Sequence, residues 1–418
     1  MGKTMQNDQL DVAIIGAGFS GMYLLHRLRD ELGLNVQLFE AGDGVGGTWY
    51  WNRYPGARCD SESYYYSYSF SEELEQEWEW SSRYPDQPEI LTYLNHVADR
   101  FDLRKSITFN CRINESTFDE GSNLWSLKSE NGSTISARFV AAAVGCLSTT
   151  NVPNFKGVDK FEGDWYHTGA WPHEGVDFSG KRVGLIGTGS TAIQATPVIA
   201  AEAQHLTVFQ RTPNFSVPAR NAPLPADEAA EIKANYRDIR DRCRNSANGF
   251  PFEMSERLAS DVGDEERRAI YDELWEKGGF RFVAESFADL TVDEFANETA
   301  SNYIRDKISE MVKDQEVAKL LMPFDHPYAT KRPPIDTDYY DTYNRDNVSL
   351  VDVRSAPIVE ITAKGVKTEG EEYELDAIVF ATGFDAMTGS LLKIFFYYCQ
   401  DCPWTLINFL IVLPNIIN

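Results

Sequence analysis

Two glycine-rich turns, about 170 residues apart, have residue types and spacing that could bind a nucleotide. The first turn, Gly16–Gly21 (Gly-Ala-Gly-Phe-Ser-Gly), follows the apolar run Asp11–Ile15, and Glu40 stands 19 residues beyond it. Glycines at this spacing let a pyrophosphate approach the backbone at a helix N-terminus, and the carboxylate accepts hydrogen bonds from a ribose diol. The first turn therefore predicts a dinucleotide site.

The second turn, Gly187–Ala192 (Gly-Thr-Gly-Ser-Thr-Ala), ends in alanine, which this motif tolerates. At the tip of its second strand stands Arg211, followed by Thr212, where the first unit has Glu40. A guanidinium there attracts a ribose 2′-phosphate that a carboxylate would repel, so NADPH is favoured over NADH. Lys331 could supply a second positive charge. The alternative interpretation is a surface arginine at a strand end.

The elements around both turns predict an α/β fold with two Rossmann-like domains. Each turn lies between an apolar strand and a helical pattern. Asn131-Gly132 predicts a hairpin with a type I′ turn, and Phe139–Val144 predicts a buried strand returning to the first nucleotide site. Residues 226–321 are acidic and helical, with a capping box at Thr291–Glu294. We interpret them as an insertion in the second domain whose charges form a solvated face.

The composition limits the classes of partner. The net charge of −25 argues against nucleic acids and anionic membrane surfaces. The N-terminus is polar, without the apolar region of a secretory signal, so we expect a cytoplasmic protein. Cys399 and Cys402 form a CxxC pair, but no second pair or histidine pair accompanies it. We therefore expect reduced thiols and no metal site.

The C-terminal residues differ in character from the rest of the chain. Ile394–Asn418 contains no Lys or Arg and only one acidic residue, and Leu406–Ile411 is apolar. The apolar part is shorter than the roughly 20 residues of a membrane-spanning helix, and it has no amphipathic stripe. It is either a buried terminal segment or a sequence foreign to the original fold, and we favour the second interpretation.

Two further segments combine aromatic residues, glycines and charges. Gly46–Asp60 carries two arginines and an aspartate, which core segments rarely contain, and Phe161–Pro172 immediately precedes the second nucleotide unit. The second segment matches the FxGxxxHxxxW(P/D) fingerprint of Baeyer–Villiger monooxygenases, a class of flavoprotein monooxygenases. The first segment resembles that family's GGTWYWNRYPGxRxD loop, and Gln210–Asn214 and Ala381–Asp385 also match. The resemblance runs from about Asp11 to Leu392 and is greatest to members acting on phenylalkyl, cyclic or steroid ketones.

The resemblance implies a role for each matching position. The fingerprint residues, expected on a linker between the domains, are Phe161, Gly163, His167, Trp171 and Pro172. The residues expected to hold FAD are Gly16, Gly18, Phe19, Ser20, Gly21, Glu40, Gly47, Thr48, Trp49, Arg58, Asp60 and Tyr66. Those expected to hold NADPH are Gly187, Thr188, Gly189, Ser190, Thr191, Ala192, Gln194, Arg211, Thr212 and Lys331. Arg332 matches the active-site arginine, and Asp60 would orient it and offset its burial.

The implied reaction inserts one oxygen atom of O2 beside a ketone carbonyl to give an ester or lactone. In this family NADPH reduces FAD, and the reduced flavin reacts with O2 to form a C4a-peroxyflavin that attacks the ketone. The peroxide of this flavin is negatively charged, and a fixed cation such as Arg332 would stabilise that charge. An alternative is a related flavin monooxygenase that oxygenates nitrogen or sulfur.

The resemblance also implies a domain plan. Residues 1–148 would form the N-terminal part of an FAD domain, and 149–384 an NADPH domain with a helical insertion at about 222–322. Residues 385–418 would be a truncated return to the FAD domain followed by the atypical tail, because family members run well over a hundred residues beyond the position of Leu392. A third possibility is therefore an inactive, truncated nucleotide-binding fragment.

Overall fold

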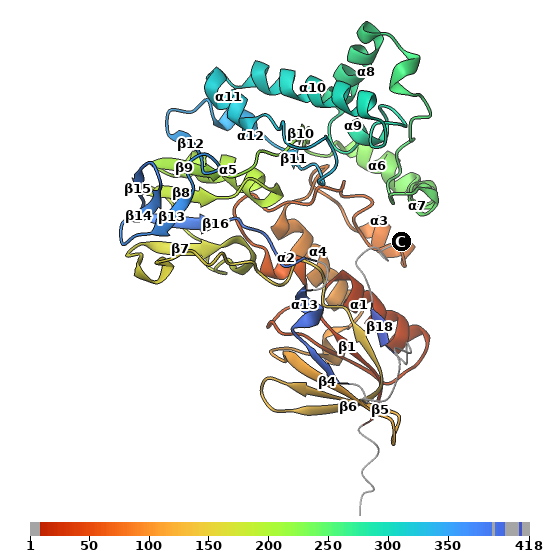
Figure 1. Ribbon diagram of the computed structural model, residues 1–418. Coiled ribbons are helices and arrows are strands. Elements are labelled where there is room, and N and C mark those ends of the chain that lie inside the picture. The colour runs from red at the N-terminus through yellow and green to blue at the C-terminus, as the bar shows by residue number, and fades with distance from the viewer. Residues whose placement is uncertain (1–8, 387–388, 398–408, 412–418) are drawn as a thin grey trace, which may run out of the picture. The chain divides into compact units, whose positions relative to one another are not determined.

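The computed structural model describes residues 9–386, 389–397 and 409–411, which belong to two compact units (Figure 1). Unit 1 combines the described residues up to Asn52 with Pro88–Asn151 and the described residues from Phe384 onward, and unit 2 combines Arg53–Gln87 with Val152–Gly383. The sequence prediction had placed residues 53–87 in the first domain, whereas the structure groups them with the second unit. Their side chains pair with the helical insertion, across separations in sequence that no local pattern reveals.

Unit 1 is built on a mixed sheet with the strand order β17-β4-β5-β6-β1-β2-β3. Its strands are β1 (Leu10–Ile15), β2 (Val36–Phe39), β3 (Ile107–Thr108), β4 (Ile113–Asp119), β5 (Leu124–Ser129), β6 (Thr134–Ala142) and β17 (Phe395–Tyr397). Strand β1 lies between β2 and β6 and is parallel to both. Strand β18 (Phe409–Ile411) also pairs with β6. Its helices are α1 (Phe19–His26), α2 (Thr48–Trp51), α4 (Gln87–Arg100) and α13 (Gly389–Leu392). The parallel strands converge on the first glycine turn, as expected.

The predicted hairpin is present, but its turn type was wrong. Strands β5 and β6 pair antiparallel, with Lys128 opposite Thr134. The hydrogen bond that closes the turn runs from the Gly132 N–H to the Ser129 carbonyl at 2.9 Å. Gly132 has a φ of 86°, whereas the φ of Asn131 is not positive. A type I′ turn needs positive φ at both central residues, so this is a type I turn followed by a left-handed glycine.

Unit 2 contains a parallel sheet with the strand order β12-β9-β8-β16-β7. Its strands are β7 (Asp164–His167), β8 (Arg182–Ile186), β9 (His205–Gln210), β12 (Val348–Asp352) and β16 (Ala377–Phe380). Helix α5 (Ser190–Glu202) connects β8 to β9, which confirms the predicted second βαβ unit. Two small sheets accompany it: β10 (Val217–Pro218) with β11 (Ile335–Asp336), and β13 (Ile358–Ile361) with β14 (Gly365–Thr368) and β15 (Glu372–Glu374).

The predicted insertion is helical, as expected. It contains α6 (Ala226–Ala234), α7 (Tyr236–Asn245), α8 (Asp264–Lys277), α9 (Arg281–Ala284), α10 (Glu294–Met311) and α11 (Gln315–Leu321). The cap of α10 was predicted wrongly. The Asp293 carboxylate, not the Thr291 hydroxyl, accepts the bond from the Ala296 N–H, at 2.9 Å. A carboxylate is a strong N-cap, and the helix therefore begins two residues later than the Thr291 capping box would place it.

The C-terminal segment is described only in part. Ile394 is buried in the core of unit 1, and the described part of the apolar block Leu406–Ile411 is strand β18. Cys399 and Cys402 lie outside the described residues. No helix in the described part of the chain is long and apolar enough to cross a membrane.

Candidate functional site

The first glycine turn is closely packed against its neighbours. Gly16 has a φ of 103°, and a β-carbon there would lie 2.5 Å from the carbonyl oxygen of Ala143. A β-carbon at Gly21 would collide with the carbonyl of Gly16, so glycine permits the close approach of α1 to β1. No side chain caps α1 at Gly18, and the start of such a helix is where backbone N–H groups can bind an anion.

Glu40 organises this turn from the tip of β2. It is 4% exposed, and its two carboxylate oxygens accept hydrogen bonds from the N–H groups of Ala17 at 2.7 Å and Gly42 at 2.8 Å. Each oxygen retains a second lone-pair direction, so the carboxylate can still accept a ribose hydroxyl. Gly47, with a φ of 54°, packs against Gly18 and places Thr48 and Trp49, at the start of α2, beside the turn. These residues of unit 1 fit an FAD pyrophosphate and ribose.

The second turn has the same construction in unit 2. A β-carbon at Gly187 would collide with the carbonyl of Ala381, whereas no atom lies within 4 Å of one at Gly189. Helix α5 also begins without a side-chain cap. The Thr188 hydroxyl donates to the Thr212 carbonyl at 2.7 Å, which ties the turn to the residues after β9. The turn therefore has both the open backbone and the uncapped helix that a second pyrophosphate needs.

Arg211 and Lys331, the two cations predicted to bind the 2′-phosphate, are both exposed. Arg211 directly follows β9 and forms no hydrogen bond or ion pair with any residue that the structure describes. An unpaired guanidinium at this strand end is available to a phosphate. The structure does not pair Lys331 with Arg211, so a joint site remains a prediction.

Gln194, predicted to contact NADPH, holds a loop of the same unit. Its side-chain oxygen accepts from the Tyr54 hydroxyl at 2.8 Å, and its Nε2 donates to the Arg58 carbonyl at 3.0 Å. Gly56, with a φ of 79°, lies against the Gln194 carbonyl. The Arg58 guanidinium itself donates to the Tyr84 carbonyl. Sequence reasoning missed that Gln194 fixes the loop leading to Asp60.

The structure brings Asp60 and Arg332 together from positions 272 residues apart. They form an ion pair in which the Asp60 side chain is 19% exposed and the Arg332 side chain 60% exposed. The expected burial of Arg332 is therefore not observed in this structure. An exposed ion pair is weak and does not by itself fix its two side chains. The direction of the Arg332 guanidinium therefore depends on how firmly the backbone that carries Asp60 is held.

The fingerprint residues flank β7, with Phe161 and Gly163 before its first residue and the other three at or after its last, and all five lie in unit 2. His167 is 3% exposed; its Nδ1 accepts from the Gly169 N–H at 3.0 Å, and its Nε2 lies 3.3 Å from the Thr382 hydroxyl. Trp171 packs against Tyr166 and Phe178. Gly163 is required because a β-carbon there would lie 2.5 Å from the Asp376 carbonyl. These contacts connect β7 with the Thr382 segment, whereas a linker role remains a prediction.

Asp336, which sequence reasoning also missed, is a buried carboxyl four residues after Arg332. Burial raises its pKa from 3.8 to about 6, and the Ser216 hydroxyl, 2.6 Å away, offsets this only in part. The unfolded chain therefore loses this proton first as the pH rises, so the protein loses stability between pH 3.8 and about 6 and carries the full cost above that range. A pKa difference of this size corresponds to about 3 kcal/mol.

We therefore expect Asp336→Asn to stabilise the protein at pH 8 by about 1–3 kcal/mol and to give almost no gain at pH 4. Thermal unfolding at the two pH values measures the difference. Asp346→Asn, which removes an exposed carboxylate, is the matched control and should show no such dependence. Equal stabilisation by Asp336→Asn at both pH values would contradict the raised pKa.

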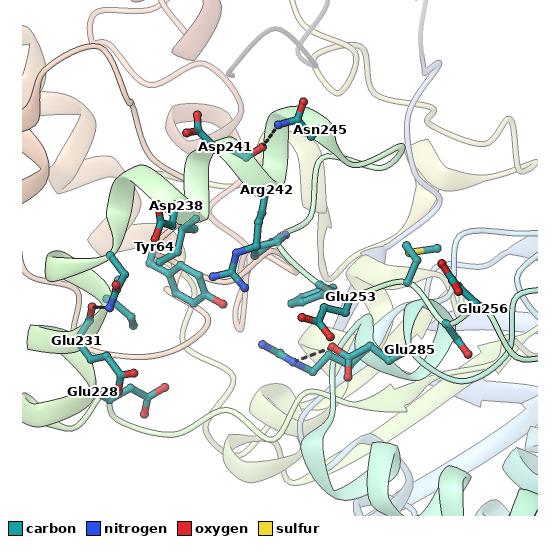
Figure 2. Close-up of a pocket in the computed structure, with 18 of the residues that line it drawn as sticks. Tyr64, Glu228, Glu231, Asp238, Asp241, Arg242, Asn245, Glu253, Glu256 and Glu285 are labelled. Atoms are coloured by element: carbon teal, nitrogen blue, oxygen red, sulfur yellow. Dashed lines mark hydrogen bonds and ion pairs between the residues drawn. The ribbon is translucent and has the colours of Figure 1, made fainter.

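A cavity that is separate from the predicted cofactor residues lies within unit 2. It has a volume of about 1340 Å³ and is lined by residues of α6, α7 and the segment after α7 (Figure 2). Most of its labelled side chains are carboxylates, including Glu228, Asp238 and Glu253 (Figure 2). None of the predicted cofactor residues lines it.

Comparisons with known proteins agree with this geometry. A family model described as "FMO-like: Flavin-binding monooxygenase-like" matches residues 9–218. The chain is 48% identical to a Baeyer-Villiger monooxygenase of Pseudooceanicola batsensis, over 94% of this chain and 71% of that protein. It is also 48% identical to phenazine N-monooxygenase PhzNO1 of Lysobacter antibioticus, over 92% of this chain and 72% of that protein. A crystal structure of OTEMO in complex with FAD and NADP matches with a TM-score of 0.91 and 42% identity, over 94% of this chain and 75% of that chain.

Proposed function

The chain belongs to the flavin-binding monooxygenase-like family, and from this premise we propose that it is a Baeyer–Villiger monooxygenase using FAD, NADPH and O2. Its substrate would be a small ketone, converted to an ester or lactone. The observation that carries the proposal is the Asp60–Arg332 ion pair in a chain with two uncapped glycine turns. A nucleotide-binding protein without this chemistry would need the turns but not the ion pair.

The residues of the chain supply position and charge, whereas FAD, when bound, supplies the redox and oxygen-transfer chemistry. The N-termini of α1 and α5 would hold the two pyrophosphates, and Arg211 would bind the 2′-phosphate. Arg332 would stabilise the negative charge that develops on a carbonyl oxygen when the ketone is attacked. Asp60 would orient the guanidinium toward that charge. An arginine suits this position because it remains protonated throughout the reaction.

The first experiment is an absorbance spectrum of the purified 418-residue chain, followed by anaerobic addition of NADPH. We expect a yellow protein that bleaches, and an ester or lactone after addition of O2 and a ketone. A colourless protein that takes up no added FAD would overturn the proposal and favour the inactive fragment.

A second candidate is oxygenation of nitrogen, supported by the similarity to phenazine N-monooxygenase PhzNO1. The two reactions differ in the nucleophile, because the nitrogen of the substrate attacks the oxygen in one case and the oxygen attacks the carbonyl in the other. Product analysis with a ketone and an aromatic N-heterocycle in parallel separates them. An N-oxide as the sole product would favour the second candidate.

A further inference from the structure

Glu62, two residues after Asp60, is the centre of a buried charge cluster in unit 2. Its side chain is 1% exposed. The Arg83 guanidinium contacts one carboxylate oxygen at 2.6 and 2.8 Å, and Arg281 of α9 forms a close ion pair with the same oxygen. The hydroxyls of Tyr64 and Tyr84 also donate to the carboxylate. One carboxylate therefore joins the loop that carries Asp60 to the helical insertion.

The cluster holds its residues in place because the opposite charges of Glu62, Arg83 and Arg281 offset the cost of burying each of them. Burial alone would raise the pKa of Glu62, but the hydrogen bond and charge of Arg281 and the charge of Arg83 hold the pKa below its usual value. Removing one member of such a group leaves the others buried without compensation, which is strongly destabilising. Glu62 therefore stays ionised and paired, and its backbone is held in place.

A second arginine of the insertion holds the same segment further along. Arg240 of α7 is 4% exposed and donates to the Tyr65 carbonyl at 3.1 Å and the Ser67 hydroxyl at 2.8 Å. It also pairs with Glu75 at 2.8 Å. Helices α7 and α9 therefore both bind the segment that begins at Asp60. The insertion, which the sequence suggested was a solvated face, has a second side that binds this loop.

We propose that Glu62 is a positioning residue: held by Arg83 and Arg281, it fixes the backbone that carries Asp60, and Asp60 in turn fixes the direction of the Arg332 guanidinium. Because Arg332 is largely exposed, its order must come from Asp60. On the preceding side, the Cys59 N–H donates to the Pro85 carbonyl at 3.1 Å, so Asp60 is anchored both before and after. The catalytic consequence rests on the proposed function, whereas the positioning itself does not.

Cys59 provides a reporter next to Asp60 that needs neither cofactor nor activity. It is 4% exposed, and burial raises its pKa to about 12, so a thiol-alkylating reagent reacts with it only when the loop opens. Cys111 in unit 1 and Cys243 in α7 are also buried and report on opening elsewhere. Peptide mass spectrometry after timed alkylation measures all three rates in one sample.

In Glu62→Gln and in Arg281→Lys we expect alkylation of Cys59 to accelerate at least about tenfold, while Cys111 and Cys243 keep their wild-type rates. Arg281→Lys keeps the charge and carries the test if Glu62→Gln does not fold. The matched control is Glu285→Gln, which removes a carboxylate that also pairs with Arg281, at 3.6 Å, on the wall of the cavity (Figure 2). It should leave Cys59 protected. Unchanged Cys59, or equal acceleration of all three cysteines, would overturn the proposal.

Enzyme turnover adds a second, separable test. We expect Glu62→Gln to lower the ester formed per NADPH consumed by about tenfold, and Glu62→Gln combined with Asp60→Asn to be no worse than Asp60→Asn alone. If the loss of ester in the double variant equalled the product of the losses in the two single variants, Glu62 would not act through Asp60. If the wild-type chain forms no ester, the proposed function fails while the cysteine result still decides the positioning.

Discussion

Replacing Arg332 by alanine should leave the reduction of FAD by NADPH intact and lower ester formation by about 10²- to 10³-fold. The guanidinium pairs with Asp60, 60% of its side chain is exposed, and it is the fixed cation proposed to face the reacting carbonyl. Hydride transfer to flavin does not require that charge, whereas attack on a ketone does. Anaerobic bleaching of the flavin measures the first step, and the ester formed per NADPH consumed measures the second.

Arg138→Ala is the matched control for this prediction. Arg138 is also exposed, at 57%, and pairs with an aspartate, Asp11, at 3.1 Å, but it lies at the far end of β1 and β6 from the first glycine turn. We expect it to reduce flavin and form ester at the wild-type ratio. Normal ester formation by Arg332→Ala would remove Arg332 from the mechanism, and loss of flavin reduction would instead assign it to nucleotide binding.

The parts of the fold that sequence predicted well are those encoded locally. The glycines of both nucleotide turns are spaced within one strand-turn-helix unit, so their spacing alone indicated the turns, although Gly16 and Gly187 pack against carbonyls far along the chain, those of Ala143 and Ala381. The start of α10 was harder, because Thr291 and Asp293 are both capping residues and only the folded backbone selects between them. The type of the turn at Gly132 depended in the same way on the local strand geometry.

Contacts between distant segments could not be predicted from local pattern. The Asp60–Arg332 pair was expected only from the family resemblance, and nothing in the sequence around Glu62 marks its partner Arg281, 219 residues away. The ion pairs of Glu62 with Arg281 and of Glu75 with Arg240 join residues 53–87 to the helical insertion of unit 2. Asp336 was missed because its surroundings, not its neighbours in sequence, set its pKa.

Replacing Arg211 by alanine should lower kcat/KM for NADPH by about 10- to 100-fold and leave kcat/KM for NADH nearly unchanged, the range expected for one charge-assisted phosphate contact. Arg211 is exposed at the end of β9 and has no partner among the described residues, so its loss disturbs no contact within the protein. Only a ligand carrying the 2′-phosphate should register the change. Initial rates of anaerobic flavin reduction with the two nucleotides measure the selectivity.

The same assay decides between a specificity residue and a surface arginine. A parallel fall for NADPH and NADH would assign Arg211 to the common part of the nucleotide, and no change with either would support the surface interpretation. Lys331→Ala separates the contribution of the second cation: if both charges bind one phosphate, the double variant should lose less than the product of the two single losses. If the loss of kcat/KM in the double variant equals the product of the two single losses, Lys331 contacts a different part of the nucleotide from Arg211.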